Sequence, residues 1–142
     1  MTWNKRWMDL AKTVAGWSKD PSTKVGAVII DSREVVRALG WNGIPRGVTD
    51  VGRDTRPEKY LWYEHAERNA IYNAASTGTP LEGTTLFTTL PPCSDCARAI
   101  IQSGIKKVVT TRTVPNENWN EHWDVAHQMF EEAGIELEMR VD

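Results

Sequence analysis

Apolar residues at the start of the chain recur at alternating steps of four and three positions: Trp3, Trp7, Leu10, Val14 and Trp17. This spacing puts them on one face of an α-helix, for which Thr2 is a suitable N-cap. We expect the tryptophans of this face, Trp3, Trp7 and Trp17, to lie in the core or at an interface between subunits.

The rest of the chain divides into β-rich runs, helical segments and turns. The predicted elements are strands at 25–30 and 35–41, a helix at 65–77, a strand at 84–90, a helix at 94–104, a strand at 106–111, a helix at 118–133 and a strand at 135–141. Alternation of this kind predicts the α/β class, with one mixed sheet and helices on its faces. Repeats, low-complexity segments and linkers are absent, so residues 1–142 are expected to form a single domain.

A long loop is predicted at residues 41–59, which contain three glycines and two prolines. A loop of this length in a compact domain is usually functional or disordered. Its second half carries charges of both signs, which we expect to be solvated: Arg53, Asp54, Arg56, Glu58 and Lys59.

The charge balance argues against several classes of function. Lys and Arg number 17 against 19 Asp and Glu, a net charge of -2, whereas nucleic-acid-binding proteins are usually basic. The chain lacks an apolar run long enough to cross a membrane, and its amphipathic start lacks the apolar centre of a signal peptide. We therefore expect a cytoplasmic protein with reduced thiols and with no nucleic-acid or membrane partner.

Both cysteines lie in the segment PPCSDC, residues 91–96. Prolines suit the first turn of a helix, and Cys93 and Cys96 share one face of that turn. The positive end of the helix favours the thiolate, which is the form that binds metals. Inert buried cysteines, a redox CxxC pair and a zinc site are the alternatives. A redox pair usually follows the first strand of a thioredoxin-like unit, whereas this pair lies late in the chain.

A zinc site needs further ligands, because a catalytic zinc takes three protein ligands and a structural zinc takes four. His65 opens a predicted helix, and Glu67 follows two positions later. The combination of H-x-E with P-C-x-x-C is the signature of zinc deaminases. Residues two positions apart point to nearly opposite sides of a helix. Periodicity alone therefore does not place His65 and Glu67 around one metal, and the arrangement works only if the metal lies just off the helix end.

Hydrolytic deamination accounts for these residue types. Zinc lowers the pKa of bound water from about 15.7 to about 7, and one histidine with two cysteines leaves a fourth position for that water. Glu67 is the candidate that takes the water's proton and protonates first the ring nitrogen and then the departing amine. Ala66 is small enough to form a tight wall beside a flat ring, although alanine is also simply a good helix former.

From about Trp7 to Val141 the chain resembles the deoxycytidylate (dCMP) deaminases of the cytidine deaminase superfamily. Four segments carry the resemblance: SKDPSTKVGAVII, GWNGIPRGVTD, HAERNAI and TTLPPCSDCARAII. It implies deamination of dCMP to dUMP with release of ammonia, which supplies thymidylate synthesis. It also implies a three-layer α-β-α sandwich around a five-stranded mixed sheet, with zinc between the two motif helices. Because the chain has no further cysteine, we expect one zinc ion per subunit.

The resemblance also implies contacts with the substrate. In the N-G-x-P-R-G segment, Asn42 is expected against the sugar, with Gly43 beside it. Ser22 and Lys24 match the phosphate-binding region near the first strand, and Arg46 matches the region in the long loop. Two cations in loops that flank one hairpin can hold a monophosphate between them.

Regulation and some of the specificity stay open at this point. The resemblance implies homo-oligomers, of which we favour a hexamer, and many members respond to dCTP and dTTP as effectors. The alternative substrates are a tRNA adenosine, a free nucleoside, dCTP or a 5-substituted dCMP. The net charge argues against a tRNA, and Lys24 and Arg46 argue against a free nucleoside. A non-catalytic zinc-binding module is the last alternative, but it would not need Glu67 and would prefer a fourth protein ligand.

Overall fold

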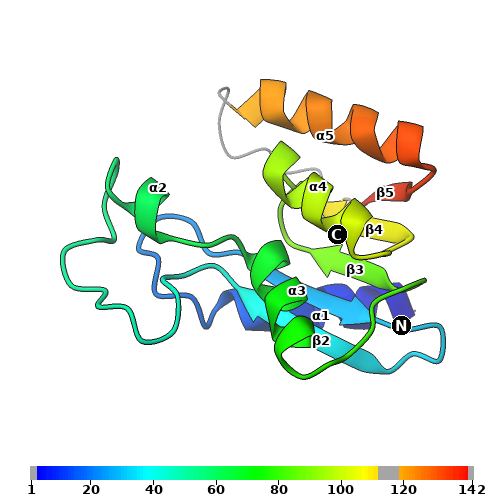
Figure 1. Cartoon of the computed structure of the whole chain (residues 1–142), viewed down its shortest axis with the longest axis horizontal. Coiled ribbons are helices and arrows are strands. Elements are labelled where there is room, and N and C mark those ends of the chain that lie inside the picture. Colours follow the sequence, from blue (N-terminus) through cyan, green and yellow to red (C-terminus); the bar gives the residue numbers. More distant parts are fainter. Residues whose placement is uncertain (1–2, 112–118, 141–142) are drawn as a thin grey trace.

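The computed structural model describes residues 3–111 and 119–140 and contains one five-stranded sheet in the order β2-β1-β3-β4-β5 (Figure 1). The strands are β1 (Gly26–Ile30), β2 (Val36–Trp41), β3 (Thr85–Thr88), β4 (Lys107–Thr111) and β5 (Glu136–Arg140). β1 pairs antiparallel with β2 and β3, whereas β3, β4 and β5 run parallel to one another. The sheet is therefore mixed, as the sequence predicts.

Helices cover both faces of this sheet. They are α1 (Trp3–Ala15), α2 (Lys59–Trp62), α3 (Ala66–Ser76), α4 (Ser94–Gln102) and α5 (Trp119–Ala133). α1 packs on one face through a core cluster that includes Met8 and Phe87. α3, α4 and α5 lie over the other face, where Ile100 and Phe130 are fully buried (Figure 1). This arrangement confirms the predicted three-layer α-β-α sandwich. None of the helices in the described ranges is long and apolar enough to span a membrane.

Only part of the predicted apolar face of α1 is buried. Val14 is fully buried, and Trp7 and Leu10 pack against the core. Trp3 and Trp17 each keep 51% of their surface exposed, so the core is the wrong place for these two, and the predicted alternative, an interface between subunits, stays a prediction.

The buried residues of the helix also include Ala11 and Ala15. Gly26 of β1 lies directly under this pair, and a Cβ added there would come within 2.5 Å of the Ala15 backbone nitrogen. Small residues on both sides let the helix backbone approach the sheet, and this close approach decides which face is buried.

A second close approach positions α3 on the opposite face of the sheet. Gly40 of β2 lies against the first turns of this helix, and a Cβ added there would come within 2.7 Å of the Ala66 carbonyl oxygen. Ala66, Ala70 and Ala74 turn their small side chains into the core. Because α3 begins with the H-x-E motif, the contact with Gly40 sets the distance between that motif and the sheet.

The predicted loop at 41–59 is present, with one difference at its end. Its last residue, Lys59, opens the four-residue helix α2, which the sequence did not predict. The start of this segment meets the chain beyond α2 at an isolated bridge between Gly43 and Glu64, which encloses residues 43–64. Their backbone groups exchange two hydrogen bonds of 3.1 and 2.7 Å. The bridge closes the segment into a flap whose base lies next to His65.

Candidate active site

The chemically important side chains project from the N-termini of α3 and α4. His65 is the N-cap of α3 and Cys93 is the N-cap of α4, and both have extended backbone angles. Neither side chain caps its own helix, so each is available to point away from the helix end. His65 therefore precedes the helix instead of lying within it. This removes the geometric conflict that the i, i+2 spacing of His65 and Glu67 presents in an ideal helix.

The structure brings His65, Cys93 and Cys96 together. The His65 Nδ1 atom lies 3.4 Å from Cys93 Sγ and 3.3 Å from Cys96 Sγ, and all three ligand atoms lie within 4.8 Å of one another. For Zn–S and Zn–N bonds of about 2.3 and 2.05 Å, a tetrahedral ion separates such atoms by about 3.6 Å. One imidazole and two thiols at these separations fit a zinc ion that keeps a fourth position open.

The two thiols differ in their affinity for protons. A hydrogen bond from Cys96 lowers the pKa of Cys93 to about 4, against the effect of burial and with the help of His65. The same hydrogen bond and burial raise the pKa of Cys96. The hydrogen bond to Cys93 also raises the pKa of His65. The pair already holds one thiolate, which suits the binding of a metal cation.

A cation from the chain itself compensates part of this negative charge. Arg68, one turn into α3, lies 2.6 Å from Glu64 and 3.7 Å from Asp95 in two ion pairs. Burial acts to lower the pKa of Arg68, but the electrostatic interactions with Cys96, Glu64 and Cys93 outweigh it and raise that pKa. The guanidinium therefore stays charged beside the ligand cluster.

Glu67 is buried next to the predicted ligands, with 4% of its surface exposed. Thr88 of β3 donates a hydrogen bond from Oγ1 to Glu67 Oε1 at 3.3 Å. Burial raises the pKa of Glu67, and the charge of His65 opposes that shift. A carboxyl group whose pKa is raised in this way can both accept and return a proton near neutral pH.

A cavity of about 120 Å³ opens beside Glu67. Four of the predicted site residues line it, namely Asn42, His65, Ala66 and Glu67. Tyr63, Leu90 and Pro91 contribute apolar surface to the same cavity. One predicted ligand, His65, therefore faces the same space as the Glu67 carboxyl and the predicted sugar contact Asn42, while Cys93 and Cys96 lie beside His65 and outside the lining.

The other predicted contacts lie outside this lining. Gly43 and Arg46 line a neighbouring cavity, where the Arg46 guanidinium donates to Asn73 Oδ1 at 2.8 Å. Lys24 is exposed and donates to the Ser18 carbonyl oxygen at 2.5 Å. Ser22 is also exposed, but its hydroxyl belongs to a polar network that reaches the first cavity.

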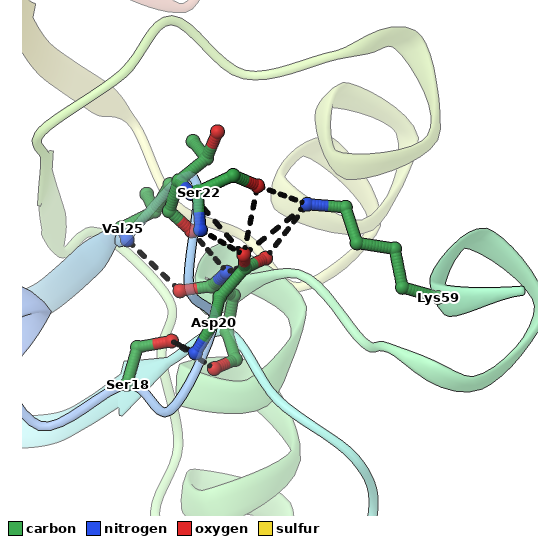
Figure 2. A network of polar contacts seen from close by, with 7 residues as sticks. Ser18, Asp20, Ser22, Val25 and Lys59 are labelled. Carbon is green, nitrogen blue, oxygen red and sulfur yellow. Dashed lines mark hydrogen bonds and ion pairs between the residues drawn. The ribbon is translucent and has the colours of Figure 1, made fainter. Parts of the chain in front are cut away.

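Two cations in the lining were missed by the sequence analysis. Arg56 and Lys59 both face the cavity. The prediction of a solvated side chain is wrong for Lys59, which is 5% exposed and lies 3.0 Å from Asp20 in an ion pair. Figure 2 shows Lys59 reaching across to Asp20 and Ser22. Nothing in the local sequence around Lys59 signals burial, because its partner lies 39 positions earlier.

Comparison with known proteins agrees with the geometry of the site. Residues 1–112 match the family model described as the cytidine and deoxycytidylate deaminase zinc-binding region. An uncharacterized deaminase from Aliivibrio fischeri is 44% identical, with 95% of this chain and 91% of its own length covered. The deoxycytidylate deaminase of Enterobacteria phage T2 is 48% identical over 92% of this chain and 88% of its own length. The dCMP deaminase of the cyanophage S-TIM5, solved with dCMP and dUMP, is 28% identical with a TM-score of 0.79. That match covers 96% of this chain and 95% of the cyanophage chain.

Proposed function

Because the chain belongs to the cytidine and deoxycytidylate deaminase family, we propose that it is a zinc-dependent deaminase that hydrolyses dCMP to dUMP and ammonia. The observation that carries this proposal is the buried carboxyl of Glu67 beside the His65, Cys93 and Cys96 cluster, with Glu67 and His65 both lining one cavity. The product, dUMP, is the substrate for the class of reaction that methylates a deoxyuridine monophosphate. A structural zinc module would not need such a carboxyl.

His65, Cys93 and Cys96 are the residues that would hold the zinc ion. When bound, zinc supplies the Lewis acidity that makes a water molecule nucleophilic near neutral pH. The remaining chemistry is proton transfer, and Glu67 is the group placed to perform it. Its carboxylate takes a proton from the attacking water and delivers it to the ring nitrogen of the cytosine. A second proton passes through Glu67 to the amino group, which then leaves as ammonia. Thr88 holds one carboxyl oxygen, and this limits the rotation of Glu67 between the two tasks.

The substrate contacts are also part of the proposal. Ala66 lies in the lining and suits a flat ring, because a larger side chain would fill the space that the ring needs. Asn42 is proposed to contact the sugar and is supported by its place in the same lining. Gly43 continues this segment beside the sugar. Ser22, Lys24 and Arg46 are proposed for the 5′-phosphate. Support for Lys24 and Arg46 is the resemblance alone. Both would have to leave their present hydrogen-bond partners, and so would the Ser22 hydroxyl and the Asn42 amide in order to donate to the substrate.

Assembly and location complete the proposal. We propose one deaminase domain over residues 1–142 that assembles into a homo-oligomer, with a hexamer favoured. The half-exposed Trp3 and Trp17 support this, because large apolar side chains at a surface often mark contacts between subunits. dCTP and dTTP are the proposed effectors. Two free thiols favour a reducing compartment such as the cytoplasm.

Deamination monitored by ultraviolet absorbance tests the function directly. The zinc-loaded protein is incubated in parallel with dCMP, dCTP, deoxycytidine and an adenosine-containing tRNA stem-loop. We expect rapid loss of the cytosine spectrum with dCMP and much slower loss with deoxycytidine. Activity on the stem-loop alone would contradict dCMP as the substrate but would leave the zinc-dependent deamination mechanism in place. Inactivity on all four substrates with zinc bound would favour a binding module.

A further inference from the structure

An ion pair that the proposed chemistry does not use lies buried beside the cavity. Asp20 is 2% exposed and Lys59 is 5% exposed. The Lys59 ammonium lies 3.2 Å from Asp20 Oδ1, 3.0 Å from Asp20 Oδ2 and 2.8 Å from Ser22 Oγ. Taking two charges out of water is costly, and a buried pair is for that reason a weak source of net stability. The fixed geometry of the Asp20–Lys59 pair therefore indicates a role other than stabilising the fold.

Asp20 is the centre of a network that holds two of the proposed substrate contacts. Its Oδ1 atom accepts hydrogen bonds from the backbone nitrogen and the hydroxyl of Ser22, at 2.9 and 3.0 Å. Its Oδ2 atom accepts from Asn42 Nδ2 at 3.3 Å. The Asn42 amide is fixed further by Thr23 and Val25: it donates to the Thr23 carbonyl oxygen and accepts from the Val25 backbone nitrogen. Figure 2 shows this convergence on the Asp20 carboxylate.

Lys59 joins this network from the far end of the flap, which comprises residues 43–64. It lies on α2, six positions before His65, whereas Asp20 and Ser22 lie in the loop before β1. Asp20, Asn42 and Lys59 all line the cavity that contains Glu67. The ion pair therefore joins two segments of the cavity wall and orients the polar groups between them.

The charges indicate that Lys59 orients other groups and does not itself bind the phosphate. Its three donor positions are directed at Asp20 and Ser22, and its charge is balanced by the Asp20 carboxylate. Arg56 lines the same cavity without forming an ion pair to any carboxylate of the described residues. Arg56 is thus the lining cation that remains available to an anionic group.

We infer that the buried Asp20–Lys59 ion pair is a positioning device that sets Ser22 and Asn42 for the sugar and phosphate of the substrate. This inference rests on the proposed function, because it assigns a role within the same reaction. Loss of Lys59 leaves the buried Asp20 carboxylate without its cation and Ser22 Oγ without a donor, so the Ser22 hydroxyl loses its fixed orientation, while Thr23 and Val25 still hold the Asn42 amide. Binding of the nucleotide weakens, while proton transfer at Glu67 continues.

Steady-state kinetics of Lys59→Met, which keeps the length of the side chain, test the inference. KM and kcat are measured with dCMP and with deoxycytidine, together with the zinc content and the melting temperature. We expect KM for dCMP to rise about tenfold or more, in line with the loss of hydrogen bonds to a charged group. We expect kcat to stay within about twofold, the zinc content to be unchanged and the effect on deoxycytidine to be smaller.

Lys19→Met is the matched control. Lys19 pairs with Asp50 at 3.5 Å and joins the same two segments of the chain, but both partners are solvent-exposed. We expect wild-type KM and kcat in this variant, because an exposed pair orients nothing in the cavity.

The outcomes separate the inference from the proposed function. Wild-type KM for dCMP in Lys59→Met would overturn the inference. Parallel losses of kcat, zinc and activity on both substrates would overturn it as well, since they indicate a structural role. If Lys59→Met does not fold, Ser22→Ala is measured in its place, and an unchanged KM there also overturns the inference. A wild-type protein that is inactive on dCMP contradicts the proposed function itself.

Discussion

The close contact between Gly40 and α3 allows a quantitative test of how the fold positions His65 and Glu67. Gly40→Ala adds one methyl group to β2, and its Cβ would lie 2.7 Å from the Ala66 carbonyl oxygen and still closer to the Ala70 backbone nitrogen. Both neighbours are backbone atoms, so no side chain can rotate to make room. The closest contact, to the Ala70 backbone nitrogen, sets the displacement: restoring an ordinary distance of 3.4 Å requires α3 to retreat from β2 by about 1.0 Å.

The consequences follow for both stability and activity. Overpacking of a well-packed core costs about 1–3 kcal/mol, which corresponds to roughly 4 °C of melting temperature per kcal/mol in a chain of this length. The retreat also carries His65 and Glu67 away from Cys93 and Cys96, which lie on α4. A displacement of about 1 Å in an active site can cost a hundredfold in rate. We therefore expect kcat to fall about ten- to a hundredfold.

Gly26→Ala provides the matched comparison. Its Cβ would meet backbone atoms of Ala11 and Ala15 on α1, which carries none of the proposed site residues. Calorimetry and dCMP turnover are measured for both variants. We expect similar losses of melting temperature, with a clearly larger loss of kcat in Gly40→Ala. Equal losses of kcat in the two variants, or a wild-type melting temperature in Gly40→Ala, would refute the reasoning.

Three further predictions concern acid stability, the metal and the phosphate. Burial acts to raise the pKa of Asp20, but hydrogen bonds from the Ser22 backbone and from Lys59 outweigh it and lower the pKa. Asp20 therefore contributes stability that is present above its unfolded pKa and is lost as the pH falls through its lower folded pKa, below about pH 4. Melting temperatures between pH 3 and 7 should fall less steeply in Asp20→Asn, and an identical slope would contradict this. Removal of zinc by a chelator should abolish deamination and lower the melting temperature, because the residues that would hold the metal lie at the N-termini of two different helices; zinc should restore both, and full activity of the zinc-free protein would argue against a catalytic metal. Arg56→Ala, Lys24→Ala and Arg46→Ala should each raise KM for dCMP more than for deoxycytidine, and equal effects on the two substrates would remove that residue from the phosphate site.

The motif residues could be predicted from the sequence because their geometry is local. His65 and Cys93 are themselves the extended N-cap residues that precede α3 and α4, so their side chains leave the helix ends wherever those helices pack. Only the meeting of the two helix ends depends on the fold. The deaminase signature supplied that information, since periodicity alone opposes a shared site for His65 and Glu67.

The residues that sequence analysis missed depend on contacts between distant segments. Lys59 looks like one of several surface charges until the fold brings the Asp20 carboxylate to it. The buried face of α1 also depends on a distant residue. The apolar periodicity favours the tryptophans, but Gly26 of β1 permits the close approach of Ala11 and Ala15. The errors on Lys59 and on α1 share one cause. The residue pattern within one segment carries no information about the part of the fold against which that segment packs.

The central claim is that Glu67 carries the protons of a zinc-dependent deamination. Glu67→Gln tests it most directly, because the amide keeps the shape of the carboxyl and removes its ability to exchange protons. Zinc content and dCMP turnover are measured in the same samples. The account predicts wild-type zinc content, with kcat lowered by about a hundredfold to ten-thousandfold, the range of general acid–base catalysis. A Glu67→Gln protein that folds, binds zinc and deaminates dCMP at the wild-type rate would contradict it.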